Sequence, residues 1–128
     1  MTNRDELLKA LDLAGTTLDD PSVICWRDLE PSIAADELEH LTDWVNWINQ
    51  RYRLDHKVVP PCWAQHGCLV EELSALHTYW QACYLEDASP ADPVGFHRDL
   101  DLALRRLRDW SSRLGCSRIA HRSEFGDC

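Results

Sequence analysis

The chain has 128 residues, of which 45% are hydrophobic and 27% are charged, and its length is typical of a single domain. This composition is that of an ordinary globular protein and excludes a disordered chain. The formal charge of −9 argues against general binding to nucleic acid or to an anionic membrane, because both need a dominant basic face.

The first expected element is a short helix that begins at Asn3. Glu6 follows three residues later, as in a capping box, and Leu7, Leu8 and Leu11 supply an apolar face. The terminus is polar, and no apolar run approaches the length of a signal sequence or membrane span. We therefore expect a cytoplasmic protein.

A long helix is expected over residues 34–52. Before it, the apolar run at 23–26 predicts either a short strand or an extended segment laid over the core. Within the helix, apolar residues recur every three or four positions, at Leu38, Leu41, Val45, Ile48 and Tyr52. Pro60 and Pro61 cannot continue a helix, so the segment that follows should be irregular.

Two further long helices are expected over residues 63–85 and 93–114. The first begins at Trp63 or Gly67, and its apolar stripe consists of Leu69, Leu73, Leu76, Trp80 and Cys83. For the second, Asp92 is the expected N-cap, Pro93 the first helical residue and Gly115 the C-terminal stop.

Three apolar stripes and short connectors predict an all-α fold. We expect one domain over residues 1–128: a small antiparallel helical bundle of three long helices, with a short N-terminal helix and irregular connectors. The residues expected to be mutually buried are Val45, Ile48, Leu73, Leu76, Leu104 and Leu107.

Two Cys–His pairs are the candidate site. Cys62 lies four residues before His66, and Cys116 lies five residues before His121. If helix 93–114 returns antiparallel to helix 63–85, both pairs lie at the same end of the bundle. Two thiolates and two imidazoles form a complete tetrahedral set for structural zinc, so zinc is the predicted cofactor.

An alternative is that these side chains only fill the interior, since cysteine is among the most buried residue types. Cys68 and His56 are substitutes if one of the four ligands is wrong, while Cys83 should pack in the core. In a reducing cytoplasm we expect all six cysteines to be thiols or metal ligands.

Some of these residues form a recognisable pattern. Residues 61–66 read Pro-Cys-Trp-Ala-Gln-His, a helix with Trp80 follows, and Gly115-Cys116 with His121 closes the pattern. Together with Trp-Val-Asn-Trp at 44–47, they resemble an uncharacterised domain-of-unknown-function family of actinobacteria, their plasmids and their phages. The resemblance implies a bacterial protein, encoded on a chromosome or a mobile element, and implies no activity.

No phosphate loop, nucleophile elbow or zinc-protease motif is present, and we expect that the chain is not an enzyme. One alternative is a thiol-dependent enzyme that uses Cys62 or Cys68 with His66. A second alternative is an acidic inhibitor or nucleic-acid mimic, given the negative charge.

Trp44, Trp47 and Arg51 are the predicted partner-binding residues. The two tryptophans lie about one turn apart, and aromatic residues and arginine are the types that most often anchor protein partners. The expected partner is a protein or a second copy of the chain. The alternative is that both rings cover the N-terminal helix or the 23–26 segment. An interaction protein should leave at least one indole exposed.

Overall fold

The computed structural model describes residues 21–116, and in this range it contains helices and no strand. The long helices are α2 (Pro31–Arg51), α3 (Gly67–Cys83) and α4 (Asp92–Leu114), and single 3-10 turns form η1 (Trp26–Asp28) and η2 (Trp63–Gln65). The predicted all-α class is confirmed for these residues. The predicted N-terminal helix lies outside them.

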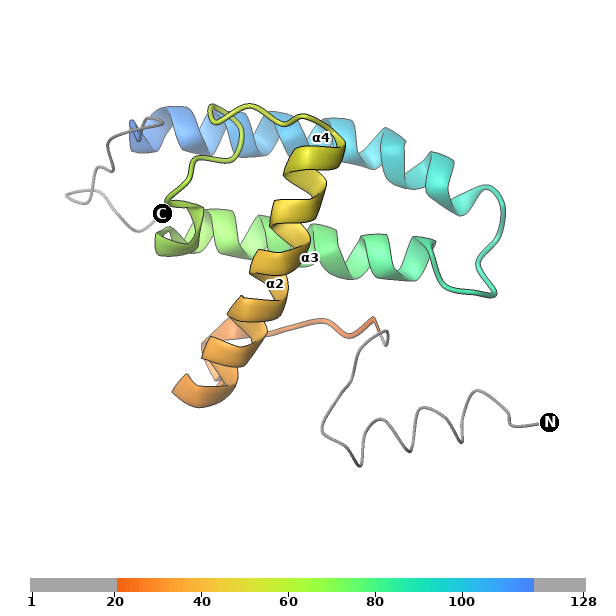
Figure 1. The fold of residues 1–128 in the computed structure, drawn as a ribbon, viewed down its shortest axis with the longest axis horizontal. Helices are drawn as coiled ribbons and strands as arrows, with labels where there is room; N and C mark the ends of the chain where they lie inside the picture. Colours follow the sequence, from red (N-terminus) through yellow and green to blue (C-terminus); the bar gives the residue numbers. More distant parts are fainter. Residues whose placement is uncertain (1–20, 117–128) are drawn as a thin grey trace.

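The helices are arranged as an antiparallel pair crossed by a third helix (Figure 1). α3 and α4 lie side by side and run in opposite directions, joined by the connector 84–91. α2 crosses α3 at a steep angle, and the long connector 52–66 returns to the start of α3. One end of the α3–α4 pair therefore gathers the start of α3 and the end of α4.

The beginnings of two helices differ from the sequence-based expectation. α2 begins at Pro31, because the fixed φ of proline suits the first helical turn. Ala91, not Asp92, is the N-cap of α4. The prediction for Asp92 is wrong by one position: its Oδ2 accepts the backbone N–H of Ser89 at 3.0 Å and so closes the turn that precedes the helix.

The backbone conformation of a few residues marks where the helices end. α2 ends where Arg53 takes a positive φ of 53°. α3 ends at Cys83, two residues before the predicted Leu85. Gly115 ends α4 as predicted, with a φ of 73°, because glycine enters the left-handed region without a steric penalty from Cβ.

The core lies between the three long helices. Of the six residues predicted to be mutually buried, five are: Val45, Ile48, Leu73, Leu76 and Leu107. The prediction is wrong for Leu104, which is half-buried and packs on the rim of the core. Leu104 lies beside the buried face of α4, which consists of Phe96, Leu100, Ala103, Leu107, Ser111 and Leu114.

The segment 21–25 is extended and forms no strand. The Thr78 hydroxyl on α3 donates to the Ser22 carbonyl, with an O–O distance of 3.3 Å. Val23 is 90% exposed, so the 23–26 run covers the core only in part. In residues 21–116, no helix combines the length and the apolar character needed to cross a bilayer.

Candidate metal centre

The connector between α2 and α3 is held firmly in place before it reaches the candidate ligands. Val58, Val59 and Pro60 are buried, and the buried Ser111 hydroxyl on α4 donates to the Val58 carbonyl at 3.0 Å. Trp63 is 5% exposed and anchors η2 in the core. The connector is thus attached both to α4 and to the core.

The two ligands in this connector lie at the edges of η2. Cys62 immediately precedes the turn and His66 immediately follows it. Backbone hydrogen bonds from Gln65 N–H to the Cys62 carbonyl and from His66 N–H to the Trp63 carbonyl close the turn. His66 is also the N-cap residue of α3, so its backbone position is set by the start of that helix.

Cys116 reaches the same place from the end of α4. The Gly115 N–H donates to the Ser111 carbonyl at 3.1 Å, and the left-handed glycine then turns the chain away from the helix axis. Cys116 follows directly and is half-buried. The antiparallel pairing of α3 and α4 therefore brings together residues 50 positions apart.

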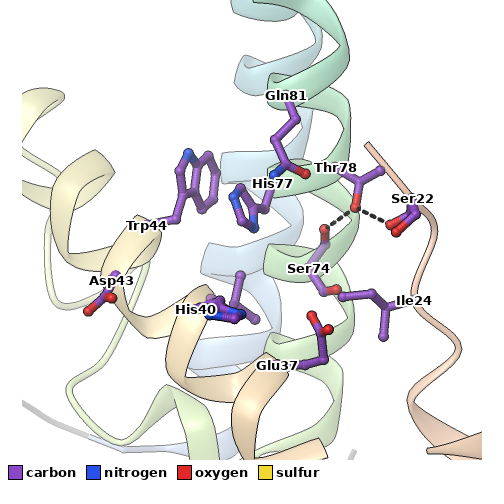
Figure 2. Close-up of a pocket in the computed structure, with 11 residues that line it drawn as sticks. Ser22, Ile24, Glu37, His40, Asp43, Trp44, Ser74, His77, Thr78 and Gln81 are labelled. Atoms are coloured by element: carbon purple, nitrogen blue, oxygen red, sulfur yellow. Dashed lines mark hydrogen bonds between the residues drawn. The ribbon is translucent and has the colours of Figure 1, made fainter. Parts of the chain in front are cut away.

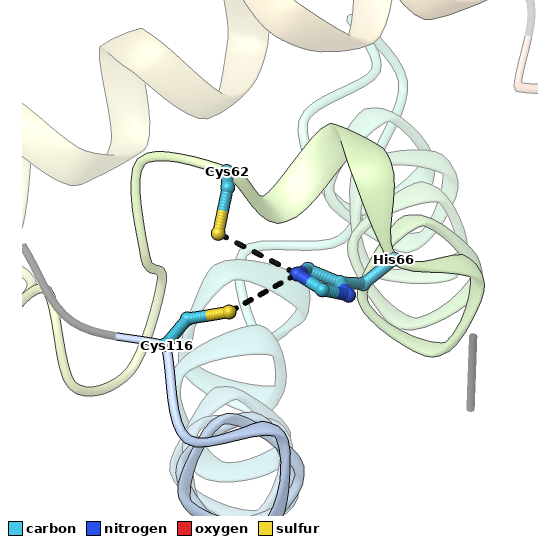
Figure 3. Close-up of side chains that lie close together, drawn as sticks. All are labelled: Cys62, His66 and Cys116. Carbon is cyan, nitrogen blue, oxygen red and sulfur yellow. Dashed lines mark hydrogen bonds between the residues drawn. The ribbon is translucent and has the colours of Figure 1, made fainter. Parts of the chain in front are cut away.

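Three donor atoms converge at this end of the fold (Figure 3). His66 Nε2 lies 3.5 Å from the Cys62 sulfur and 3.3 Å from the Cys116 sulfur. All three donor atoms lie within 4.8 Å of one another. His66 is fully buried, whereas the two cysteines are half-buried. This cluster of Cys62, His66 and Cys116 has the composition and the spacing to hold a metal ion.

A shared ion satisfies these atoms better than their mutual contacts do. The Nε2 atom of a neutral imidazole offers one lone pair or one N–H, so it can engage only one thiol fully. Two thiolates and one imidazole nitrogen can all donate to one cation, and the cation removes the repulsion between the two sulfurs.

The environment of Cys62 argues against its use as the activated nucleophile of an enzyme. Burial, with the neighbouring Cys116 thiol, raises the pKa of Cys62 to about 11. At neutral pH this sulfur is then a protonated thiol, while the thiolate is the reactive form. A bound cation would reverse this effect, because coordination deprotonates a thiol.

Three of the four predicted ligands meet in space. The fourth, His121, lies outside the described residues. Of the two substitutes, His56 pairs with Asp55 at 2.9 Å and is not part of the cluster. Cys68 is disulfide-bonded, so the expectation that every cysteine is a thiol or a ligand is wrong for this residue. Cys83 is 5% exposed and packs in the core, as predicted.

The predicted partner-binding tryptophans have different environments. Trp44 is 6% exposed and belongs to the core, where its ring stacks on His77 with centroids 4.8 Å apart. Trp47 is 41% exposed, and Arg51 is exposed on the last turn of α2. The expectation of one exposed indole is confirmed by Trp47.

Trp47 is part of a larger cluster of rings that the sequence does not reveal. We call this cluster the aromatic surface. Its members come from α2, α3, α4 and their connectors, and consist of Trp47, Tyr52, Trp80, Tyr84 and His97. The Tyr52 hydroxyl and His97 Nε2 are 2.8 Å apart, a contact that links α4 to the end of α2. Only the crossing of the helices brings these five rings together.

A cleft of about 350 Å³ lies between α2, α3 and the 21–25 segment (Figure 2). Glu37 and Asp43 from α2 and His77 from α3 line it. Thr78 contacts the carbonyls of Ser22 and Ser74 along its wall. Among residues 21–116, the side chains that line the cleft are acidic or neutral, with no lysine or arginine.

Burial of the His77 ring, with the nearby His40, lowers the pKa of His77 to about 4. In the unfolded chain the His77 ring takes up a proton near pH 6.5, whereas in the folded protein this ring stays uncharged until the pH falls to about 4. Stability that is present above pH 6.5 should therefore be lost as the pH falls toward 4. Lowering the pH from 7 to 4.5 should reduce the free energy of unfolding of both proteins. We expect the reduction to be about 2 kcal/mol smaller in His77→Gln than in the wild type, because glutamine takes up no proton.

Urea unfolding of both proteins across this pH range measures the difference, and NMR titration of the His77 ring reports its pKa directly. Equal pH dependence in the two proteins, or a ring that titrates near pH 6.5, would contradict this prediction.

Comparison with known proteins found no matching family model, curated protein or solved structure.

Proposed function

We propose that this chain is a small helical module that binds a protein partner, and that a zinc ion holds one end of its fold together. Zinc is the metal that best fits two thiolates and an imidazole, since softer sulfur ligands exclude magnesium and calcium. His121, outside the described residues, is the proposed fourth ligand. Four protein ligands would make the site structural.

The observation that carries the binding function is the exposure of Trp47 within the aromatic surface. Trp47 is 41% exposed and Tyr84 is 43% exposed, and Trp80 lies between them, with centroids 5.3 Å from each. Tryptophan and tyrosine dominate the energetics of protein interfaces. Aromatic rings gathered on one exposed face are typical of an interaction site.

The overall charge of the chain favours a basic partner. The full sequence has a formal charge of −9. Beside the rings themselves the charges are mixed, since Glu86 and Asp87 follow Tyr84, whereas Arg98 follows His97 and arginines flank Tyr52. Electron-rich ring faces on an acidic protein attract arginine and lysine side chains. We therefore propose a protein with arginine or lysine side chains at its contact surface.

This proposal agrees with the alternative of an acidic inhibitor that blocks a basic partner. It disfavours a thiol-dependent enzyme, because the raised pKa of Cys62 and the disulfide of Cys68 leave neither sulfur as a ready nucleophile. A bacterial cytoplasmic location and a mobile-element origin stay predictions from the sequence.

The test is Trp47→Ala, a change that removes an exposed ring. We expect the thermal midpoint to change little, because surface substitutions usually alter stability by less than about 0.5 kcal/mol. Affinity for the partner should fall about 30-fold or more, as is usual for an aromatic anchor. Tagged full-length protein would be used to capture partners from the source cells. Each candidate partner would then be purified and titrated against the wild type and against Trp47→Ala.

Val94→Ala is the matched control, because Val94 is 70% exposed and lies on α4 outside the aromatic surface. A basic protein that binds the wild type and Val94→Ala but not Trp47→Ala supports the proposal. Equal binding by all three proteins contradicts it. If sedimentation shows a dimer that only Trp47→Ala dissociates, the partner is a second copy of the chain and the proposed basic partner is wrong.

A further inference from the structure

The sulfurs of Cys62 and Cys116 are neighbours as well as candidate ligands. They lie within 4.8 Å of each other, and both face His66 Nε2 (Figure 3). Cys116 is half-buried, so a small oxidant can reach its sulfur from solvent, whereas Cys62 is the more buried of the two. Of the described cysteines, these are the two that the fold brings together.

We propose that Cys62 and Cys116 form a redox modification site, at which peroxide converts the two thiols into a reversible intrachain disulfide. The same bond would release a metal held by the centre, and this second part rests on the proposed zinc site. The bond itself requires only that the two sulfurs meet.

The chemistry requires one peroxide molecule for each disulfide. The Cys116 sulfur, the less buried of the two, attacks a peroxide oxygen, the O–O bond breaks, and this sulfur becomes a sulfenic acid while the other oxygen leaves as water. The neighbouring Cys62 sulfur then attacks the sulfenic sulfur as its proton passes to the departing oxygen, the S–O bond breaks and a second water leaves. Two electrons pass from the sulfur pair to the peroxide, and a dithiol reductant reverses the step.

The small movement that the bond needs has to come mainly from the side of Cys116, because the buried Trp63 anchors the connector that carries Cys62. A disulfide requires sulfurs about 2.05 Å apart, so the present gap must shorten. Cys62 lies between the Pro60-Pro61 bend and η2, and Cys116 follows the left-handed Gly115, so neither cysteine is inside a long helix. The Cys62 side chain can rotate about its Cα–Cβ bond, and Cys116 can shift without breaking α4, because it lies beyond the last residue of that helix.

Other cysteine pairings are less favourable. Cys83 is 5% exposed and ends α3, whereas His66 is at the beginning of the same helix. The 17 residues of α3 separate these ends by roughly 25 Å. Cys83 therefore cannot reach the metal centre unless the helix unfolds.

Metal binding and the disulfide exclude each other, because both use the same two sulfurs. Zinc needs both as thiolates, whereas the disulfide removes two of the three converging donors. Oxidation should therefore release one zinc ion for each disulfide formed, and reduction should restore the site.

The test uses the full-length chain, loaded with zinc and treated with hydrogen peroxide. A metal-sensitive dye counts released zinc while peptide mapping without reductant locates the new bond. Digestion with trypsin and a glutamate-specific protease places Cys116 in the peptide 114–118, whereas Cys62 and Cys68 share the peptide 58–71. Fragmentation of the linked peptide therefore has to distinguish Cys62 from Cys68.

The expected result is a Cys62–Cys116 bond, with one zinc ion released for each bond and zinc binding restored by dithiothreitol. Cys116→Ser should abolish the bond, and Cys25→Ser, which removes an exposed cysteine outside the centre, should leave it unchanged. Mapping of the wild type is decisive even if Cys116→Ser fails to fold.

The two proposals can fail separately. If the chain binds no zinc but peroxide still links Cys62 to Cys116, the modification site is correct and the zinc proposal is wrong. If zinc binds and peroxide yields a different bond, or only sulfinic acid at one sulfur, the modification site is wrong and the zinc proposal is unaffected.

Discussion

Replacing His66 with alanine should abolish zinc binding by the full-length protein. Its Nε2 is the atom that both sulfurs face, at 3.5 and 3.3 Å, and without it the described donors are two thiols. Changes in the residues that merely support a metal ligand cost about 10–100-fold in affinity, so loss of the ligand itself should cost about 100-fold or more. Competition with a zinc-binding dye measures the affinity.

Added zinc should raise the stability of the wild type but not that of His66→Ala. An ion present at about 1,000 times its dissociation constant stabilises a folded protein by about 4 kcal/mol. We expect this increase in the wild type and not in His66→Ala. Because His66 is fully buried, its removal also leaves a cavity, so the comparison uses the zinc-induced change within each protein.

His56→Ala is the control for this experiment. His56 lies in the same connector and pairs with Asp55, but it is outside the donor cluster. It should keep the affinity and the zinc-induced stabilisation of the wild type. Wild-type affinity in His66→Ala would contradict the proposed coordination.

Phe96→Ala should lower the free energy of unfolding by about 3–5 kcal/mol, the range for loss of a buried aromatic ring. Phe96 is fully buried on α4, where its ring packs near Tyr79 and Tyr84, with centroids 5.8 and 6.3 Å away. Removal of the ring leaves a cavity between α3 and α4. Urea unfolding at neutral pH measures the loss.

Val94→Ala again serves as the control, because it changes an apolar residue in the same turn of α4 that is 70% exposed. It should alter the free energy of unfolding by less than about 0.5 kcal/mol. A similar effect of both substitutions would mean that Phe96 is not packed as the structure describes.

The metal centre and the aromatic surface involve different parts of α3. His66 precedes the helix, and Trp80 lies near its other end, roughly 20 Å away along the axis. Loss of zinc should therefore not remove a residue from the aromatic surface. Experiments on one site can be interpreted independently of the other, provided that each variant is shown to be folded.

The helices and their main faces could be predicted from the sequence. Apolar residues at intervals of three and four identify the buried faces of α2, α3 and α4, because helix periodicity is a local property of the chain. Gly115 marks the end of α4 for the same local reason. The N-cap of α4 lies one position before Asp92, because Ser89 and Asp92 close a turn with two hydrogen bonds that propensity alone does not reveal.

Short spacings in the sequence also predicted three members of the metal centre. Cys62 and His66 are close because they flank one turn, and Cys116 joins them because two helices of similar length pair antiparallel. The state of Cys68 could not be predicted, since sequence spacing shows which cysteines are near a turn but not which sulfurs meet.

Only the tertiary structure distinguished Trp44 from Trp47. The two lie about one turn apart, and both are beside the apolar stripe of α2. Periodicity identifies a face, but the neighbour that covers this face depends on how helices cross. Because α2 crosses α3, His77 and Trp80 bury Trp44, while Trp47 stays exposed beside Tyr52 and Trp80. The local sequence thus determined the helices, and the crossing angle decided which aromatic ring is available to a partner.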